Sequence, residues 1–141
     1  MKIRHYLILF FLSSSAIFLP LSLVAAETIQ ADLNNDGIQD LKAFFNSDTL
    51  TRTELDRNGD GQADAWMLFA APQGRDWDTR ADYDENYDGQ VDQIFFIKGD
   101  TPVRSFNDGD QDGMLEEEVD YKEGAPEGKK QLDPPLDPKN L

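Results

Sequence analysis

Residues 77–97 read WDTRADYDENYDGQVDQIFFI, and this stretch contains both patterns on which the fold depends. Residues 77–83 alternate as a half-buried β-strand does, and residues 93–97 are a short aromatic and β-branched run. The segment DENYDGQVD lies between them, and its Asp-Gly pair is a strong turn signal. The stretch therefore predicts two strands joined by an acidic loop.

The acidic segment is one of four copies of the pattern Asp-x-Asn/Asp-x-Asp-Gly-x-x-Asp/Glu. The copies are DLNNDGIQD, DRNGDGQAD, DENYDGQVD and DGDQDGMLE, which begin at Asp32, Asp56, Asp84 and Asp108. Each has oxygen-bearing side chains at positions 1, 3, 5 and 9 and glycine at position 6. Calcium takes about six to eight oxygen ligands, and glycine allows the sharp turn around the ion. One copy could be a plain hairpin turn, but turn chemistry does not require an acid at position 9.

Strand patterns flank the acidic segments throughout the chain. They cover residues 41–45, 65–69, 93–97 and 117–121 after the loops, and 49–55, 77–83 and 103–106 before them. Turn signals at residues 46–48, 72–74 and 99–102 separate the units. The sequence predicts an all-β fold, an antiparallel meander of about eight short strands with four acidic metal-binding loops along one edge. Two packed layers, a curled open sheet, a partial barrel and a stack of hairpins are all compatible with this pattern.

The two ends of the chain differ from the repeats in composition. Residues 1–26 predict a signal peptide, with a basic start, an apolar stretch and small residues before Glu27. An uncleaved anchor is the alternative, because the apolar stretch approaches the ~20 residues that span a bilayer; Pro20 and the cleavage signal favour removal. We expect a secreted or periplasmic protein without stable membrane insertion. Residues 27–123 would form the β repeat domain, and the Gly-, Pro- and Lys-containing residues 124–141 a disordered Pro-rich tail.

Charge and cysteine content restrict the possible partners. Without Lys2 and Arg4 the chain has 11 basic residues (13 − 2) and 28 acidic residues, a net charge of −17. Such a chain repels nucleic acid, which is bound through basic patches. The chain contains no cysteine, so disulfides cannot supplement a small core. Bound metal is the other common way to stabilise a small exported domain.

The ligand types favour calcium over other metals. An EF-hand loop needs an acid at position 12, where this chain has Ala43, Met67, Phe95 and Val119. Magnesium requires tight octahedral geometry and retains its waters. Zinc, copper and iron prefer histidine or cysteine, and the only histidine is His5 in the predicted signal.

With ligands at positions 1, 3, 5 and 9 and a backbone carbonyl at 7, the loops resemble those of integrin-type FG-GAP and VCBS repeats and of thrombospondin type 3 repeats. They are also similar to hairpin arrays of exported bacterial proteins. The resemblance covers the loops between Asp32 and Glu116; the repeats are shorter than FG-GAP blades and contain more strand than thrombospondin type 3 repeats. It implies up to four Ca²⁺ sites, formed by Asp32, Asn34, Asp36, Asp40 and the Ile38 carbonyl; by Asp56, Asn58, Asp60, Asp64 and the Gln62 carbonyl; by Asp84, Asn86, Asp88, Asp92 and the Gln90 carbonyl; and by Asp108, Asp110, Asp112, Glu116 and the Met114 carbonyl.

These features predict an exported calcium-binding repeat protein that is not an enzyme and whose fold calcium stabilises. Ser47 and Ser105 are the only serines after residue 26, and no general base lies near them in the sequence. A calcium-dependent adhesion module that binds a carbohydrate or an envelope protein is the alternative. Trp66 and Trp77 could then be a sugar platform, although their strand patterns favour the core. A glycoside hydrolase that uses two carboxylates is a remote alternative.

Overall fold

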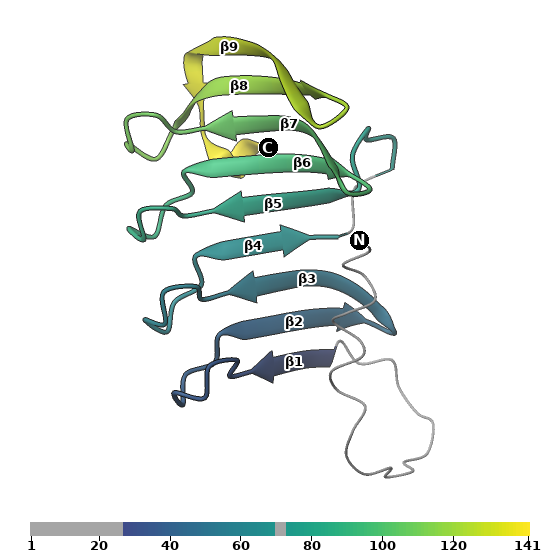
Figure 1. The fold of residues 1–141 in the computed structure, drawn as a ribbon, viewed down its shortest axis with the longest axis vertical. Coiled ribbons are helices and arrows are strands. Elements are labelled where there is room, and N and C mark those ends of the chain that lie inside the picture. Colours follow the sequence, from purple (N-terminus) through teal and green to yellow (C-terminus); the bar gives the residue numbers. More distant parts are fainter. Residues whose placement is uncertain (1–26, 70–72) are drawn as a thin grey trace.

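In the part of the chain that the structure describes, nine β-strands follow one another in a single sheet in the same order as in the sequence, and every neighbouring pair is antiparallel (Figure 1). A computed structural model describes residues 27–69 and 73–141 of the protein. The strands are β1 (Glu27–Ala31), β2 (Leu41–Asn46), β3 (Thr49–Leu55), β4 (Ala65–Leu68), β5 (Thr79–Tyr83), β6 (Gln93–Lys98), β7 (Thr101–Asn107), β8 (Leu115–Lys122) and β9 (Ala125–Leu136), and a 3₁₀ turn η2 (Pro138–Asn140) follows.

The predicted all-β antiparallel meander is confirmed, and the sheet is open rather than closed into a barrel. The acidic loops β1–β2, β3–β4, β5–β6 and β7–β8 all lie at the same side of the sheet, on the left in Figure 1. This follows from the connectivity, because alternate connections of an antiparallel meander return to the same strand ends. The repeat in the sequence therefore becomes a row of loops in space.

Two strands were not anticipated at their positions. β1 precedes the first acidic loop, where no strand pattern was assigned, and it pairs with β2 from Glu27↔Phe45 to Ala31↔Leu41. The prediction of a disordered tail over residues 124–141 is wrong, because β9 pairs with β8 from Lys122↔Ala125 to Leu115↔Leu136. β9 is an edge strand, and edge strands tolerate proline, so the Pro-rich composition does not prevent pairing.

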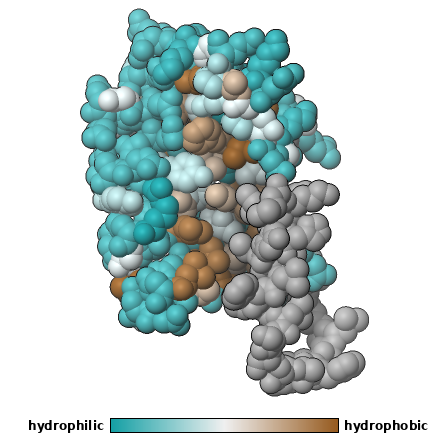
Figure 2. All heavy atoms as spheres, viewed as in Figure 1, coloured by the Kyte–Doolittle hydropathy of each residue, from teal (hydrophilic) through white to brown (hydrophobic). Residues whose placement is uncertain are grey.

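The register places one row of residues across one face of the sheet. Partner by partner, the row is Ile29, Ala43, Thr53, Met67, Ala81, Phe95, Ser105 and Val119. Small side chains alternate with large ones in its central part, and the small ones are buried because the larger neighbours cover them. Figure 2 shows the result as apolar atoms along the middle of the face in view, with hydrophilic atoms on the side where the loops lie.

The main core lies on the opposite side of β6 and β7. It contains Trp77, Ile94, Phe96, Phe106 and Leu115, all buried. The end of β9 and the residues after it cover this cluster through Leu132, Leu136 and Leu141, and the Arg80 guanidinium donates a hydrogen bond to the Pro138 carbonyl at 3.1 Å. Trp77 is thus a core residue, as its strand pattern favours, whereas Trp66 is half-buried.

The predicted signal peptide, residues 1–26, lies outside the described residues, and so does Pro72 of the predicted turn at 72–74. Within the described part of the chain, no helix has the length and apolar character needed to cross a membrane.

Candidate metal centres

The four acidic loops share one backbone conformation. We call them loop 1 (Asp32–Asp40), loop 2 (Asp56–Asp64), loop 3 (Asp84–Asp92) and loop 4 (Asp108–Glu116). Position 6 is glycine with φ between +88° and +94° in each loop, and position 4 also has positive φ. The residues at position 4 are Asn35, Gly59, Tyr87 and Gln111, with φ of 65°, 76°, 63° and 63°. Tyr87 and Gln111 have little intrinsic preference for this left-handed backbone conformation, so the geometry of the loop imposes it at position 4.

Three kinds of hydrogen bond recur in all four loops. The Asp at position 1 accepts from the glycine N–H at position 6, at 2.7–2.8 Å. The Asp at position 5 accepts from the N–H at position 7, at 2.8–2.9 Å. The acid at position 9 accepts from the N–H at position 2, at 2.6–2.9 Å. The second oxygen of each position-1 Asp also accepts a backbone N–H of its own loop, at 2.6–3.2 Å. A carboxylate has about four lone-pair sites, so these loop-holding bonds still leave acceptor capacity for a ligand.

Adjacent loops are connected through the backbone. The N–H at position 1 of loops 2, 3 and 4 donates to the position-9 carbonyl of the preceding loop, at 2.8, 2.9 and 2.8 Å respectively. The acids at these junctions are buried, namely Asp40, Asp56, Asp64, Asp84, Asp92 and Asp108. Burying a carboxylate is unfavourable unless it is hydrogen-bonded or paired with a cation. The loops therefore hold a row of partly desolvated negative charge between the hairpins.

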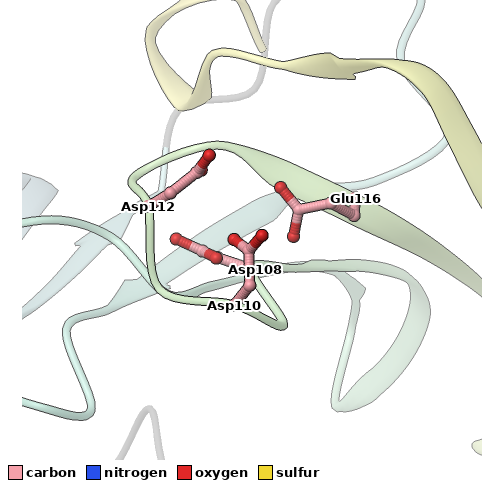
Figure 3. A group of neighbouring side chains, drawn as sticks. All are labelled: Asp108, Asp110, Asp112 and Glu116. Carbon is pink, nitrogen blue, oxygen red and sulfur yellow. The ribbon is translucent and has the colours of Figure 1, made fainter.

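Loop 4 brings four acidic side chains together (Figure 3). One carboxylate oxygen from each of Asp108, Asp110, Asp112 and Glu116 lies within 4.8 Å of those of the others. Within residues 27–69 and 73–141, this is the one set of three or more acidic or histidine side chains that converges so closely. The sequence predicted these four residues as a set, and such a group could hold a metal ion.

Glu116 has an unusual oxygen in this group. Its Oε2 accepts a hydrogen bond from the Gly109 N–H at 2.9 Å. Its Oε1 is buried and has no hydrogen-bond partner, unlike every other buried side-chain nitrogen or oxygen of the described residues. An unpaired buried polar atom costs about 1–3 kcal/mol, and more when it is charged. A cation among the four carboxylates would remove this cost.

Asparagine amides lie among the carboxylates of loops 1–3. The Asn86 Nδ2 donates to Asp88 and Asp92 at 3.2 and 3.3 Å, and the Asn34 Nδ2 donates to Asp40 at 3.4 Å. The Asn58 Nδ2 donates to Asp60 at 3.1 Å. In loop 4 the same position is Asp110, which has no amide donor. The neutral donors partly offset the negative charge in three loops, and their absence in loop 4 accounts for its unpaired oxygen.

Arg57 belongs to the site, although sequence reasoning did not single it out. It is the residue at position 2 of loop 2, and its Nε donates to Asp64 Oδ1 at 2.5 Å. Burial lowers the pKa of Arg57, but the hydrogen bonds to Asp64 and Glu85 outweigh this effect and raise it. The only sign of this role in the sequence is that loop 2 alone has a basic residue at position 2. The other loops have Leu33, Glu85 and Gly109 there.

Comparison of the chain with protein-family models, with curated proteins and with solved structures finds no match in any of the three. The chemistry of the loops is therefore the basis for inferring the function.

Proposed function

We propose that this protein is an exported, non-catalytic calcium-binding repeat protein in which ions in the four loops stabilise the fold. The observation that carries the proposal is loop 4, where four carboxylates converge around a buried oxygen that lacks a donor. Hard oxygen ligands alone, without nitrogen or sulfur, suit calcium better than zinc, copper or iron. A loop of nine residues that carries glycine at position 6 also suits the larger and more variable coordination of calcium better than that of magnesium.

The shared hydrogen bonds support extending the proposal to loops 1–3. In those loops the asparagine at position 3 has its Nδ2 towards the carboxylates, and rotation of the amide by 180° would present Oδ1 instead. In the folded chain Oδ1 accepts from the position-5 N–H at 2.8–2.9 Å, so this rotation would exchange that hydrogen bond for a metal ligand. The proposed ligands in loops 1–3 are therefore the carboxylates at positions 1, 5 and 9, the amide oxygen at position 3 and the carbonyl at position 7.

Stabilisation would act at the junctions between hairpins. The buried acids at positions 1 and 9 are joined by the backbone hydrogen bonds between successive loops. An ion that neutralises these acids lowers the cost of burying them, and binding only to the folded chain adds to the free energy of unfolding. At calcium 100-fold above Kd, each site contributes about 2.7 kcal/mol.

Calorimetric titration of the purified protein with CaCl₂ tests this proposal. We expect four ions per chain, with affinity in the range of about 10⁻⁴–10⁻³ M that extracellular modules show. Thermal unfolding in calcium and in EDTA should differ, and MgCl₂ at equal concentration should give a smaller shift. Absence of binding heat together with identical unfolding in calcium and EDTA would refute it.

A calcium-dependent binding module is the second candidate, and one observation favours it. Leu33 and Ile38 of loop 1 and Tyr87 of loop 3 are among the few exposed large hydrophobic residues of the described chain. They lie on the loop side, where a bound ion would fix their orientation. Two results together would support this candidate over a purely structural role. The protein would bind a polysaccharide or an envelope protein only in calcium, and its β-sheet would persist in EDTA.

A further inference from the structure

The four loops are not equivalent, because loop 2 already contains a cation. Arg57 Nε donates to Asp64 Oδ1, while Asp64 Oδ2 accepts from the Arg57 N–H at 2.8 Å and from the Asn58 N–H at 3.3 Å. The Asp64 side chain is only 4% exposed. Both oxygens of the position-9 ligand in loop 2 are thus occupied by donors from the same loop.

Arg57 is also held from the side of loop 3. Its Nη2 donates to the Asp84 carbonyl at 2.8 Å, and its Nη1 donates to Glu85 Oε1 at 3.2 Å. The guanidinium carbon lies 5.4 Å from the ring centroid of Tyr83 and 5.7 Å from that of Tyr87. A single exposed ion pair contributes little, but several charge-assisted hydrogen bonds with fixed geometry are stronger. Arg57 is therefore fixed between loops 2 and 3.

The other loops have no such occupant. In loops 1 and 3 the corresponding Oδ1 accepts from the asparagine at position 3 at 3.4 and 3.3 Å. That amide is neutral and has an oxygen of its own, which could become a ligand if it gave up its hydrogen bond from the position-5 N–H. A guanidinium has donors only and remains charged, so it cannot become a ligand and must move away. The proposed ligands carry a charge of −3 in loops 1 and 3 and −4 in loop 4, whereas in loop 2 Arg57 reduces it to −2 (−3 + 1).

We propose that Arg57 is an intramolecular competitor for the cation of loop 2, which makes loop 2 the weakest of the four sites. This inference rests on the proposed calcium binding. It gives the array a graded response, in which loops 1, 3 and 4 fill first and loop 2 fills only when calcium displaces the guanidinium from Asp64. Arg57 then determines the affinity of one site without being a ligand.

Calorimetric titration of Arg57→Gln with CaCl₂ tests the proposal, with Arg104→Gln as the matched control. Arg104 pairs with Glu118 and Asp120 on the sheet, so its loss removes the same charge away from Arg57 and Asp64. We expect three tighter ions and one weaker ion in the unmodified protein and in Arg104→Gln. In Arg57→Gln the weak site should tighten about tenfold or more, which corresponds to about 1.4 kcal/mol or more.

Two further variants assign the weak site and protect the test against misfolding. Asp60→Asn in loop 2 should abolish the weak ion alone, whereas Asp36→Asn at the same position of loop 1 should abolish a tight one. Leu33→Arg introduces a guanidinium at position 2 of loop 1, where the present side chain is 60% exposed, and should weaken one tight site about tenfold or more. If Arg57→Gln does not fold, calcium titration of Leu33→Arg tests the proposal instead.

The outcomes separate this inference from the proposed function. Four equal sites that neither Arg57→Gln nor Leu33→Arg alters would overturn the role of Arg57 and leave calcium binding intact. No calcium binding in any form of the protein would overturn both.

Discussion

Replacement of Glu116 by Gln should make the protein more stable without calcium and less responsive to it. The variant keeps the size of the side chain and an oxygen that can accept from the Gly109 N–H. It removes one of four negative charges and turns the buried, unpaired position of Oε1 into a site for an N–H donor. Its neighbours Asp108, Asp110 and Asp112 are acceptors for that donor.

The size of the effect follows from the separation of the charges. Two unit charges 4.8 Å apart repel by about 0.9 kcal/mol at the dielectric constant of water and by about 3.5 kcal/mol at an effective value near 20. Because Asp110 and Asp112 are exposed, we start from the lower value, which gives about 2.6 kcal/mol for three pairs. Salt screening over about 8 Å reduces this to about 1–2 kcal/mol in total. For a folded chain of about 115 residues, the entropy of unfolding is about 0.24 kcal/mol per kelvin, so Tm in EDTA should rise by about 4–8 °C.

The calcium response should change in the opposite direction. Loss of a ligand removes most of the contribution of loop 4, about 2.7 kcal/mol at 100-fold Kd, so the rise in Tm between EDTA and calcium should shrink by about 10 °C. Calorimetric unfolding in both buffers measures the two quantities. Glu118→Gln, also on β8 but paired with Arg104 and Lys130, is the control and should leave the calcium increment unchanged. A Glu116→Gln protein that is less stable in EDTA and has an unchanged increment would show that Glu116 only caps the Gly109 N–H.

Four other outcomes follow from the structure. Gln111→Asn should raise the free energy of unfolding by about 0.5–1 kcal/mol, because φ is +63° there and Asn tolerates this conformation better than Gln; chemical denaturation measures it. Burial raises the pKa of Tyr83, so above about pH 10 the unfolded chain loses this proton before the folded chain does, and stability falls as pH rises through the folded value. Denaturation at increasing pH should show a smaller alkaline loss in Tyr83→Phe. Leu136→Ala should destabilise the protein by roughly 1–2 kcal/mol, since the side chain packs on the core and is partly buried, whereas a disordered tail would tolerate it without effect. Hydrogen exchange in EDTA should be faster in β2 and β3 than in β6 and β7, and calcium should reduce the difference.

The repeat predicted the fold because two independent signals coincide at every copy. Aromatic and β-branched runs indicate strands, and Asp-Gly turns at the same side of successive strands require an antiparallel meander. The sequence did not predict β9, because four of its twelve residues are proline or glycine and most of the others are polar, whereas its pairing depends on Leu132 and Leu136 meeting a core built by distant strands. The strand boundaries also differ from the predicted ones. β8 begins at Leu115 rather than at residue 117, because Leu115 is fully buried in that core.

The sequence predicted which residues of each loop belong to the candidate site, but it did not predict which side chains pair with one another. The spacing of positions 1, 3, 5 and 9 identified the four acids that converge in loop 4, but the same spacing in loops 1–3 does not bring three carboxylates as close together. The role of Arg57 could not be predicted in the same way, because it depends on Asp84, Glu85, Tyr83 and Tyr87 of the next repeat. The contact of Arg57 with the next repeat depends on the register between β4 and β5. The sequence of a single repeat does not determine that register.

The core is distributed unevenly along the sheet, and this unevenness determines where the proposed ions would contribute most to stability. The buried cluster of Trp77, Ile94, Phe96, Phe106 and Leu115 lies within the part of the chain from Trp77 onward, and the end of β9 covers it. In β2–β4 the buried residues are mostly small, such as Ala43, Thr53 and Ala65. Hydrophobic stabilisation scales with the apolar area removed from water, so these hairpins gain less from burial than β6–β8 do. The backbone hydrogen bond between loops 1 and 2 is the same as that between loops 3 and 4. Neutralising the buried acids Asp40 and Asp56 would therefore be a larger share of the stability of the N-terminal hairpins, which have less apolar core. A chain whose core weakens towards one end would therefore depend on calcium most at that end.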